Sequence, residues 1–308
     1  MTAAPPILVT GSHRSGSTWV GRMLAHAPGV VYLHEPFNAD YYDPGTCGAR
    51  FRYRFTYVTP ANEAAYYPHL RRTTALVYNW RGALRPARGW DDVRAAWRTA
   101  ADWRRRRRAG ARLLMKDPLA LLAAPWLAQR CGARVIVLIR HPAAFVSSIL
   151  RFGWRSPLGE LLAQPLLLRD YLHPFTAEIA AYAGEDAALL EQAAVFWKML
   201  YVIVARYREQ QPDWTFVRHE DLSHAPSAGF RALCAAVGLS FTEALAVALA
   251  ETTGAGNPAP RADDFGVARL DSAANVWRWK ERLTAAEVAT VRRLTAPVAA
   301  EFYTDGDW

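Results

Sequence analysis

The chain has 308 residues, of which 52% are hydrophobic and 21% are charged. This composition predicts a folded protein with a sizeable core and excludes a disordered chain. The formal net charge is +9, and only three of the 37 basic residues are lysine, so 34 are arginine. The positive balance favours an anionic ligand or partner. The excess of arginine and alanine is typical of a GC-rich bacterial coding sequence.

The sequence offers no sign of membrane insertion or secretion. It lacks a run of about eighteen apolar residues, which predicts the absence of a membrane-spanning helix. Met1–Pro6 has neither a basic start nor an apolar stretch, so we expect no secretory signal. Cys47, Cys131 and Cys234 lie far apart and match no metal-binding spacing. We therefore expect a reducing compartment, the cytoplasm, and no metal site.

Short apolar runs with the composition of buried strands alternate with helical patterns along the chain. The helical patterns include Thr18–Ala27, Pro142–Phe152 and Ala187–Glu209. This alternation predicts an α/β fold with a central, mostly parallel sheet flanked by helices. No linker rich in Gly, Ser or Pro divides the chain, so we expect one domain over residues 1–308. The predicted strands are Ile7–Thr10, Val30–His34, Leu113–Met115, Val135–Ile139 and Thr215–Arg218.

Every predicted strand ends in polar or charged residues. In open α/β sheets the ligand binds outside the carboxyl ends of the strands, so these ends are expected to converge on one site. Ordinary polar loops would give the same pattern, and the alternative stays open. The strand ends read Gly11-Ser12-His13-Arg14, His34-Glu35, Lys116-Asp117, Arg140-His141 and His219-Glu220-Asp221.

The segment from Phe37 to Gly110 is the least regular part of the chain and is rich in aromatic residues and arginine. We expect it to be an irregular insertion that lines the substrate side of the site. Within it, Trp90–Arg108 has a helical pattern that ends in five consecutive arginines, Arg104–Arg108. Such a run is usually a solvated helix end, where cations suit the helix C-terminus. Contact with an acidic substrate or a membrane surface is the alternative.

Residues 7–19 predict a strand, a loop of small residues and a helix that starts near Gly16. Backbone N–H groups at such a helix start form a cradle for anions. The spacing Gly11-x4-Gly16-Ser17-Thr18 is similar to that of the nucleotide-binding P-loop, but Ser17 stands where that loop has its lysine. The only cation in this loop is Arg14. The substitution argues against an ATPase or a kinase.

The run from Ser12 to Trp19 resembles the 5′-phosphosulfate loop of sulfotransferases that use 3′-phosphoadenosine-5′-phosphosulfate (PAPS), and its Arg-Ser-Gly-Ser form is closest to the carbohydrate and bacterial branches. The resemblance implies a P-loop-like three-layer fold. It also implies a transferase that binds PAPS without metal and releases adenosine 3′,5′-bisphosphate. By this resemblance Trp19 stacks on adenine, and the phosphosulfate is held by Arg14, Ser15, Gly16, Ser17 and Thr18.

A second stretch, residues 135–148, resembles the 3′-phosphate motif of the same family. It has a strand, then Arg140, then Pro142 at a helix start, and Ser148 about two turns into that helix. Arg140 offers a planar fork to a phosphate. The resemblance implies that Arg140 and Ser148 hold the 3′-phosphate, with Ser147 as a weaker candidate. A structural arginine that caps the sheet is the alternative.

Sulfuryl transfer to a hydroxyl needs a base for the acceptor proton and cations for the charge that grows on the bridging oxygen. Glu35 precedes Pro36 after the second strand, and carbohydrate sulfotransferases carry a similar Glu-Pro with the glutamate as base. The cytosolic small-molecule branch has a histidine two residues after a lysine, where this chain has Pro118. We therefore expect Glu35 as the base, with Lys116 and Arg14 stabilising charge. His34 is the runner-up, expected on the opposite strand face.

The sequence thus predicts a PAPS-dependent sulfotransferase that acts on a hydroxyl of a carbohydrate, a glycolipid or a glycosylated natural product. A phenolic or small alcohol acceptor is an alternative, as is a P-loop kinase acting on a small molecule. A basic module that binds nucleic acid or another anionic polymer is a third hypothesis, which we rank below the enzymes, and we expect no nucleic-acid partner. Peripheral membrane contact through the basic surface stays open.

Overall fold

The computed structural model describes residues 4–254 and 276–308. Within them a single parallel sheet has the strand order β2-β3-β1-β4-β5. This confirms the predicted α/β fold. Three strands extend the predicted ones by one or two residues, and two match them. The strands are β1 (Ile7–Gly11), β2 (Val30–His34), β3 (Arg112–Lys116), β4 (Arg134–Ile139) and β5 (Thr215–Arg218).

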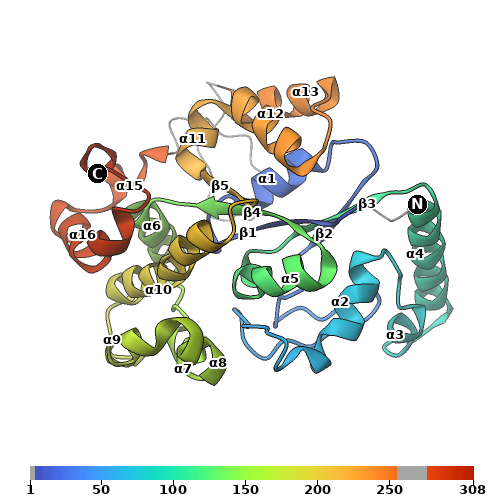
Figure 1. The fold of residues 1–308 in the computed structure, drawn as a ribbon, viewed down its shortest axis with the longest axis horizontal. Coiled ribbons are helices and arrows are strands. Elements are labelled where there is room, and N and C mark those ends of the chain that lie inside the picture. The colour runs from blue at the N-terminus through green and yellow to red at the C-terminus, as the bar shows by residue number, and fades with distance from the viewer. Residues whose placement is uncertain (1–3, 255–275) are drawn as a thin grey trace.

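Helices cover both faces of the sheet (Figure 1). Side chains alternate along the strands, as the two-residue period requires. In β1, Ile7 and Val9 face a core that includes residues of α1, α12 and α13, whereas Leu8 faces the larger core beneath α6, α10 and α16. The bounds are α1 (Ser17–Leu24), α5 (Ala124–Cys131), α6 (Pro142–Phe152), α10 (Leu189–Gln210), α11 (His219–His224), α12 (Pro226–Val237), α13 (Glu243–Thr253), α15 (Trp279–Arg282) and α16 (Ala285–Ala299).

The segment between β2 and β3 begins with little regular structure and then forms α2 (Tyr67–Thr74), α3 (Trp80–Leu84) and α4 (Trp90–Arg108). The bounds of α4 match the predicted helix. Trp103 of α4 packs with Val31 of β2 and Leu113 of β3, so α4 covers the sheet at its β2 edge. A second irregular region after α6 contains the short helices α7 (Leu158–Leu162), α8 (Pro165–Leu167) and α9 (Thr176–Tyr182).

Three further observations bear on the expectations from sequence. None of the helices in the described residues combines the length and the hydrophobicity that a bilayer crossing requires. Cys47, Cys131 and Cys234 are not paired in disulfides. Residues 4–254 and 276–308 contain no group of three or more His, Cys, Asp or Glu side chains arranged to hold a metal ion.

Candidate functional site

The loop between β1 and α1 has the backbone geometry of an anion cradle. Gly11 adopts a φ of 143°, and a Cβ there would lie 2.4 Å from the carbonyl oxygen of Leu138. Gly16, at the N-cap of α1, has a φ of 92°, and no described side chain caps the first turn of this helix. The first backbone N–H groups of α1 are therefore open to an anion. Arg14 also has a positive φ, of 62°, which is uncommon for a residue with a side chain.

The two predicted halves of a nucleotide site meet at Arg14. Its Nε donates a hydrogen bond to the Oγ of Ser148 at 3.1 Å, across 134 residues of sequence. The guanidinium of Arg140 donates to the backbone carbonyl of Arg14. Burial lowers the pKa of Arg14 to about 10, and the nearby charges of Arg140 and Arg151 contribute to this shift. The structure thus gathers several like charges around the loop, which suits a ligand with more than one negative charge.

Three polar atoms of the two predicted motifs are buried and have no hydrogen-bond partner among the residues described: Arg140 Nε, Ser15 Oγ and Ser147 Oγ. A buried polar group without a partner costs about 1–3 kcal/mol, so such atoms point to a ligand that completes them. Arg282 also belongs to this basic cluster, because the charges of Arg151 and Arg140 lower its pKa after the larger effect of burial. The unpaired polar atoms and the cluster of arginines at this place fit a phosphorylated nucleotide as the ligand.

Sequence reasoning did not identify the residues that hold Arg140 in place. On α10, Trp197 Nε1 donates to the carbonyl of Arg140 at 2.9 Å, and the hydroxyl of Tyr201 accepts from its N–H at 3.0 Å. The same hydroxyl lies 3.1 Å from the Oγ of Ser12. Tyr201 therefore links the first loop to the end of β4. Little in the sequence indicated a role for these two residues at the site, because Trp and Tyr in an apolar helix are ordinarily core residues.

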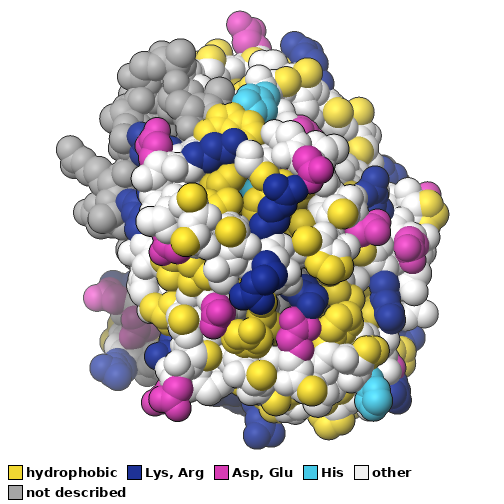
Figure 2. All heavy atoms as spheres, turned by 90° about the vertical axis from the view of Figure 1, so that its left-hand side faces the viewer, with side chains coloured by type: hydrophobic (Ala, Val, Ile, Leu, Met, Phe, Trp, Pro, Cys, Tyr) yellow, Lys and Arg dark blue, Asp and Glu magenta, His cyan; other side chains and the backbone are white. Residues whose placement is uncertain are grey.

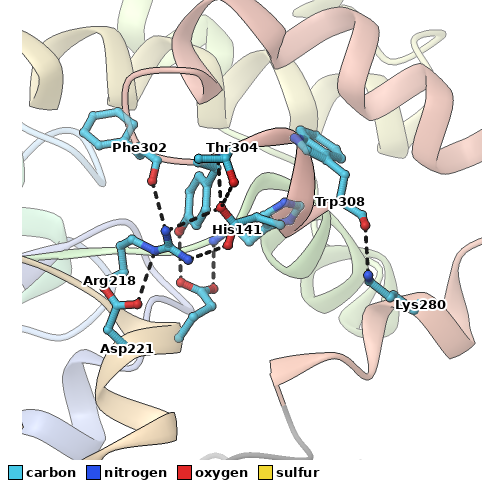
Figure 3. Close-up of polar contacts among 10 residues, drawn as sticks. His141, Arg218, Asp221, Lys280, Phe302, Thr304 and Trp308 are labelled. Atoms are coloured by element: carbon cyan, nitrogen blue, oxygen red, sulfur yellow. Dashed lines mark hydrogen bonds and ion pairs between the residues drawn. The ribbon is translucent and has the colours of Figure 1, made fainter.

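The residue after Arg140, His141, lies against the C-terminal segment 302–308, where its ring contacts Tyr303 and Trp308 (Figure 3). Glu220 accepts from the N–H of His141 at 3.0 Å and from the hydroxyl of Tyr303 at 3.0 Å. The ring of His141 stacks on Trp279, with centroids 5.0 Å apart. Arg218 pairs with Asp307 at 2.7 Å, which ties this segment to the end of β5. These contacts fix the backbone on both sides of Arg140.

Trp19 lies on α1 beside His219 and Phe230, with ring centroids 5.9 Å and 5.1 Å away. It does not line the cavity described below. His219 also approaches Gly16, where an added Cβ would lie 2.5 Å from its Nδ1. The predicted stacking of Trp19 on adenine stays a prediction.

Glu35 and Lys116 form an ion pair at the ends of adjacent strands. Lys116 Nζ lies 2.5 Å from Glu35 Oε1, and the lysine side chain is only 1% exposed. Burial lowers the pKa of Lys116, and Glu35 opposes this effect. The N–H of Glu35 donates to the carbonyl of Lys116 at 2.9 Å, which extends the β2–β3 ladder by one bond. The other carboxylate oxygen of Glu35 accepts from the side-chain amide of Asn38 at 3.2 Å.

The carboxylate of Asp117 binds the backbone near Glu35 and near Lys116. It accepts from the backbone N–H of Phe37 at 2.6 Å and from that of Leu119 at 3.0 Å. The side chain is fully buried, and burial raises its pKa to about 7. These two backbone contacts therefore hold in place the chain after Glu35 and the chain after Lys116.

The expected placement of His34 is wrong. Strand alternation predicted that His34 and Glu35 face opposite sides, but both line the same cavity, and His34 Nε2 lies 3.7 Å from Glu35 Oε1. The reason is that Glu35 follows the last residue of β2 and takes a φ of 43°. In that left-handed conformation the two-residue period of the strand no longer holds.

A cavity of about 630 Å³ joins the phosphate loop to Glu35. Arg14, Ser17 and Thr18 of the loop line it together with His34 and Glu35. Lys116 reaches it through Glu35, and Ser148 reaches it through Arg14. The remaining walls combine aromatic, apolar and charged side chains: His13, Asp40, Arg54, Phe55, Pro118, Leu119, Gly153, Trp154, Arg155 and Pro157. The arrangement can hold a neutral or polar acceptor between a carboxylate and a cationic anion cradle.

Comparisons with known proteins bear on the family and the fold of the chain. A family model described as the sulfotransferase family matches residues 5–243. The chain is similar to the sulfotransferase domain from the curacin biosynthetic pathway, with 15% identity and a TM-score of 0.53 over 97% of this chain and 99% of that chain. It is similar to the sulfotransferase domain from the Synechococcus PCC 7002 olefin synthase, with 20% identity and a TM-score of 0.49 over 97% and 96% of the two chains. No curated protein matches the chain.

Proposed function

The chain belongs to the sulfotransferase family, and from this premise we propose that it transfers a sulfuryl group from PAPS to a hydroxyl of an acceptor, with Glu35 as the base. The observation that carries the proposal is the single cavity that Glu35 shares with Arg14, Ser17 and Thr18. A base and an anion cradle are the two parts that in-line transfer from a phosphosulfate to a hydroxyl requires.

In the proposed complex the loop and the start of α1 bind the 5′-phosphosulfate. The binding groups are the backbone of Gly16 and the side chains of Arg14, Ser15, Ser17 and Thr18, and the unsatisfied Ser15 Oγ supports this assignment. Arg140 and Ser148 bind the 3′-phosphate, and the unsatisfied Arg140 Nε supports that part. ATP lacks a 3′-phosphate, so the proposed contact with Arg140 should give adenosine 3′,5′-bisphosphate a higher affinity than ATP.

When bound, PAPS supplies an electrophilic sulfuryl group. Glu35 accepts the proton of the acceptor hydroxyl as the hydroxyl oxygen bonds to sulfur and the bond from sulfur to the 5′-phosphate oxygen breaks. Lys116 orients the Glu35 carboxylate through their 2.5 Å contact, and Lys116 and Arg14 stabilise the charge on the bridging oxygen. The residues of the site supply the cations, so the proposal includes no metal.

The walls of the cavity support a carbohydrate, a glycolipid or a glycosylated natural product as the acceptor. Trp154, which is 38% exposed, offers an apolar ring, and Asp40 and Arg54 offer hydrogen-bonding groups. This combination suits a sugar, which presents both C–H faces and hydroxyls. The unpaired cysteines support a reducing compartment, such as the cytoplasm, for the reaction.

Calorimetric titration without magnesium tests the donor. Adenosine 3′,5′-bisphosphate should bind in the micromolar range, whereas AMP and ATP should bind much more weakly. Transfer of labelled sulfate to a panel of sugars, glycolipids and phenols then tests the acceptor. Failure of the bisphosphate to bind, or tight ATP binding that requires magnesium, would refute the proposal and favour a kinase.

A further inference from the structure

Helix α4 stands at the β2 edge of the sheet, at the right of Figure 1, and has one face against the protein. Ala96 and Trp103 are its buried residues. Trp103 packs against Tyr78, with ring centroids 5.6 Å apart, and against the strand residues Val31 and Leu113. The helix is therefore anchored from one side, and its opposite side is left to solvent.

The outward face of α4 combines tryptophan with arginine. Trp90 is 79% exposed and Trp97 is 72% exposed, which is unusual for so large an apolar side chain. At 3.6 residues per turn, both fall within about one third of the helix circumference together with five arginines. The residues of this surface, which we call the α4 face, are Trp90, Arg94, Trp97, Arg98, Ala101, Arg104, Arg105 and Arg108.

The α4 face contains no acidic residue. Asp91, Asp92 and Asp102 of the same helix fall outside it. Asp102 lies beside the face and pairs with Arg105 and with Arg106, and Asp91 lies 3.5 Å from Arg94. The remaining arginines of the face thus present a positive field that the helix itself does not neutralise.

Exposed aromatic residues gather in the same part of the molecule. Among the described residues, seven large hydrophobic side chains are strongly exposed, and five of them lie between Tyr41 and Trp97. The five are Tyr41, Tyr42, Trp80, Trp90 and Trp97. The side of the molecule opposite α4 differs, because basic and acidic side chains are interspersed there (Figure 2). An example on α16 and the segment after it is the pair Arg292 and Asp305.

We propose that the α4 face docks on the surface of an anionic lipid bilayer. Tryptophan favours the boundary between headgroups and acyl chains, and the arginines beside Trp90 and Trp97 would lie at the level of the headgroups. Arginine adds attraction to acidic headgroups, worth about 1 kcal/mol for each residue near the surface. The helix lies on the bilayer and does not cross it. This inference does not depend on the proposed transferase reaction.

Co-sedimentation with lipid vesicles tests the proposal on the full chain. The protein should sediment with vesicles of phosphatidylcholine and phosphatidylglycerol and stay in solution with pure phosphatidylcholine. Added salt should weaken the binding, because it screens the arginines. Two double variants each remove one component of the α4 face. Trp90→Ala with Trp97→Ala removes the exposed rings, and Arg104→Gln with Arg108→Gln removes two positive charges. Loss of two arginines should weaken binding about thirtyfold.

A matched control removes two exposed arginines elsewhere, Arg231→Gln on α12 and Arg293→Gln on α16. It should bind anionic vesicles like the unchanged protein. The substituted side chains are exposed, and Arg231 makes only a surface contact with the ring of Phe241, so thermal unfolding should change little in all three variants. The proposal is wrong if anionic vesicles do not bind, or if the α4 variants bind them as well as the control does. Binding to duplex DNA but not to vesicles would assign the face to nucleic acid and also overturn it.

Discussion

Lys116 Nζ lies 2.5 Å from Glu35 Oε1, although 81 residues separate the two in sequence. The register of β2 and β3 pairs His34 with Lys116, so the contact joins the carboxyl ends of neighbouring strands. An almost fully buried ammonium with a carboxylate partner fixes that carboxylate in one orientation. The pair therefore gives the proposed base a defined position at the edge of the cavity.

Glu35→Gln should lower kcat by about 10²–10⁴-fold, because the amide cannot accept the acceptor proton. The affinity for adenosine 3′,5′-bisphosphate should change little, since Glu35 lies outside the proposed nucleotide contacts. Rates of labelled sulfate transfer and calorimetry measure the two effects. His34→Gln is the control and should keep most of the activity. If instead His34→Gln abolishes turnover and Glu35→Gln does not, the base is His34.

Arg140→Ala should weaken binding of adenosine 3′,5′-bisphosphate by about 10–150-fold, which corresponds to a lost charged hydrogen bond of about 1.5–3 kcal/mol. AMP, which lacks the 3′-phosphate, should lose much less affinity. Arg134→Ala is the control, because Arg134 begins the same strand at its opposite end. Equal losses for the two nucleotides would mean that Arg140 only supports the loop through the carbonyl of Arg14.

Gly16→Ala should abolish nucleotide binding. The added Cβ would lie 2.5 Å from His219 Nδ1, and the φ of 92° is strained for any residue with a side chain. Gly29→Ala is a matched control, since Gly29 also has a positive φ, of 72°, but a Cβ added there would meet no described atom within 4 Å. The control should lose about 1–2 kcal/mol of unfolding free energy and keep its affinity. Calorimetry and urea unfolding separate the two effects, and unimpaired binding by Gly16→Ala would count against the cradle.

The protein should lose stability as the pH falls below about 6.5. Burial lowers the pKa of His13, His141 and His219 to about 3 each. The unfolded chain therefore binds protons first, and each histidine contributes a loss of about 1.4 kcal/mol per pH unit between these pKa values. Urea unfolding from pH 7.5 to pH 5 measures the slope. A flat or rising profile would contradict the assignment of these histidines as buried and neutral.

Asp117 should oppose part of this acid loss. Its pKa is raised by burial from 3.8 to about 7, so the folded state binds the proton first and gains stability as the pH falls from 7 towards 4. Asp117→Asn removes this gain and should steepen the acid loss by about 1.4 kcal/mol per pH unit. The comparison uses slopes, because the variant also loses a hydrogen-bond acceptor for Phe37 or Leu119. An unchanged slope would show that Asp117 is ionised throughout.

The sequence predicted the sheet well because buried parallel strands are continuous apolar runs with abrupt polar ends. The same ends predicted that Arg14, Glu35 and Lys116 come together. The sequence could not predict that Trp197 and Tyr201 hold the backbone of Arg140, since these contacts depend on how α10 packs against the end of β4. It also misplaced His34, because one positive φ at Glu35 reverses the direction that strand alternation implies.

The long segment between β2 and β3 is attached to the sheet at both ends. The N–H of Phe37 donates to Asp117, and the N–H of Arg112 donates to the carbonyl of Gly29. Between these anchors the chain supplies Asp40, Arg54 and Phe55 to the cavity, while the strand ladder and the contact of Asp117 with Phe37 hold Glu35 next to Lys116. Directed evolution of a new acceptor preference can therefore start at Asp40 and Arg54, whose side chains are exposed, and leave the contact between the proposed base and its lysine partner in place.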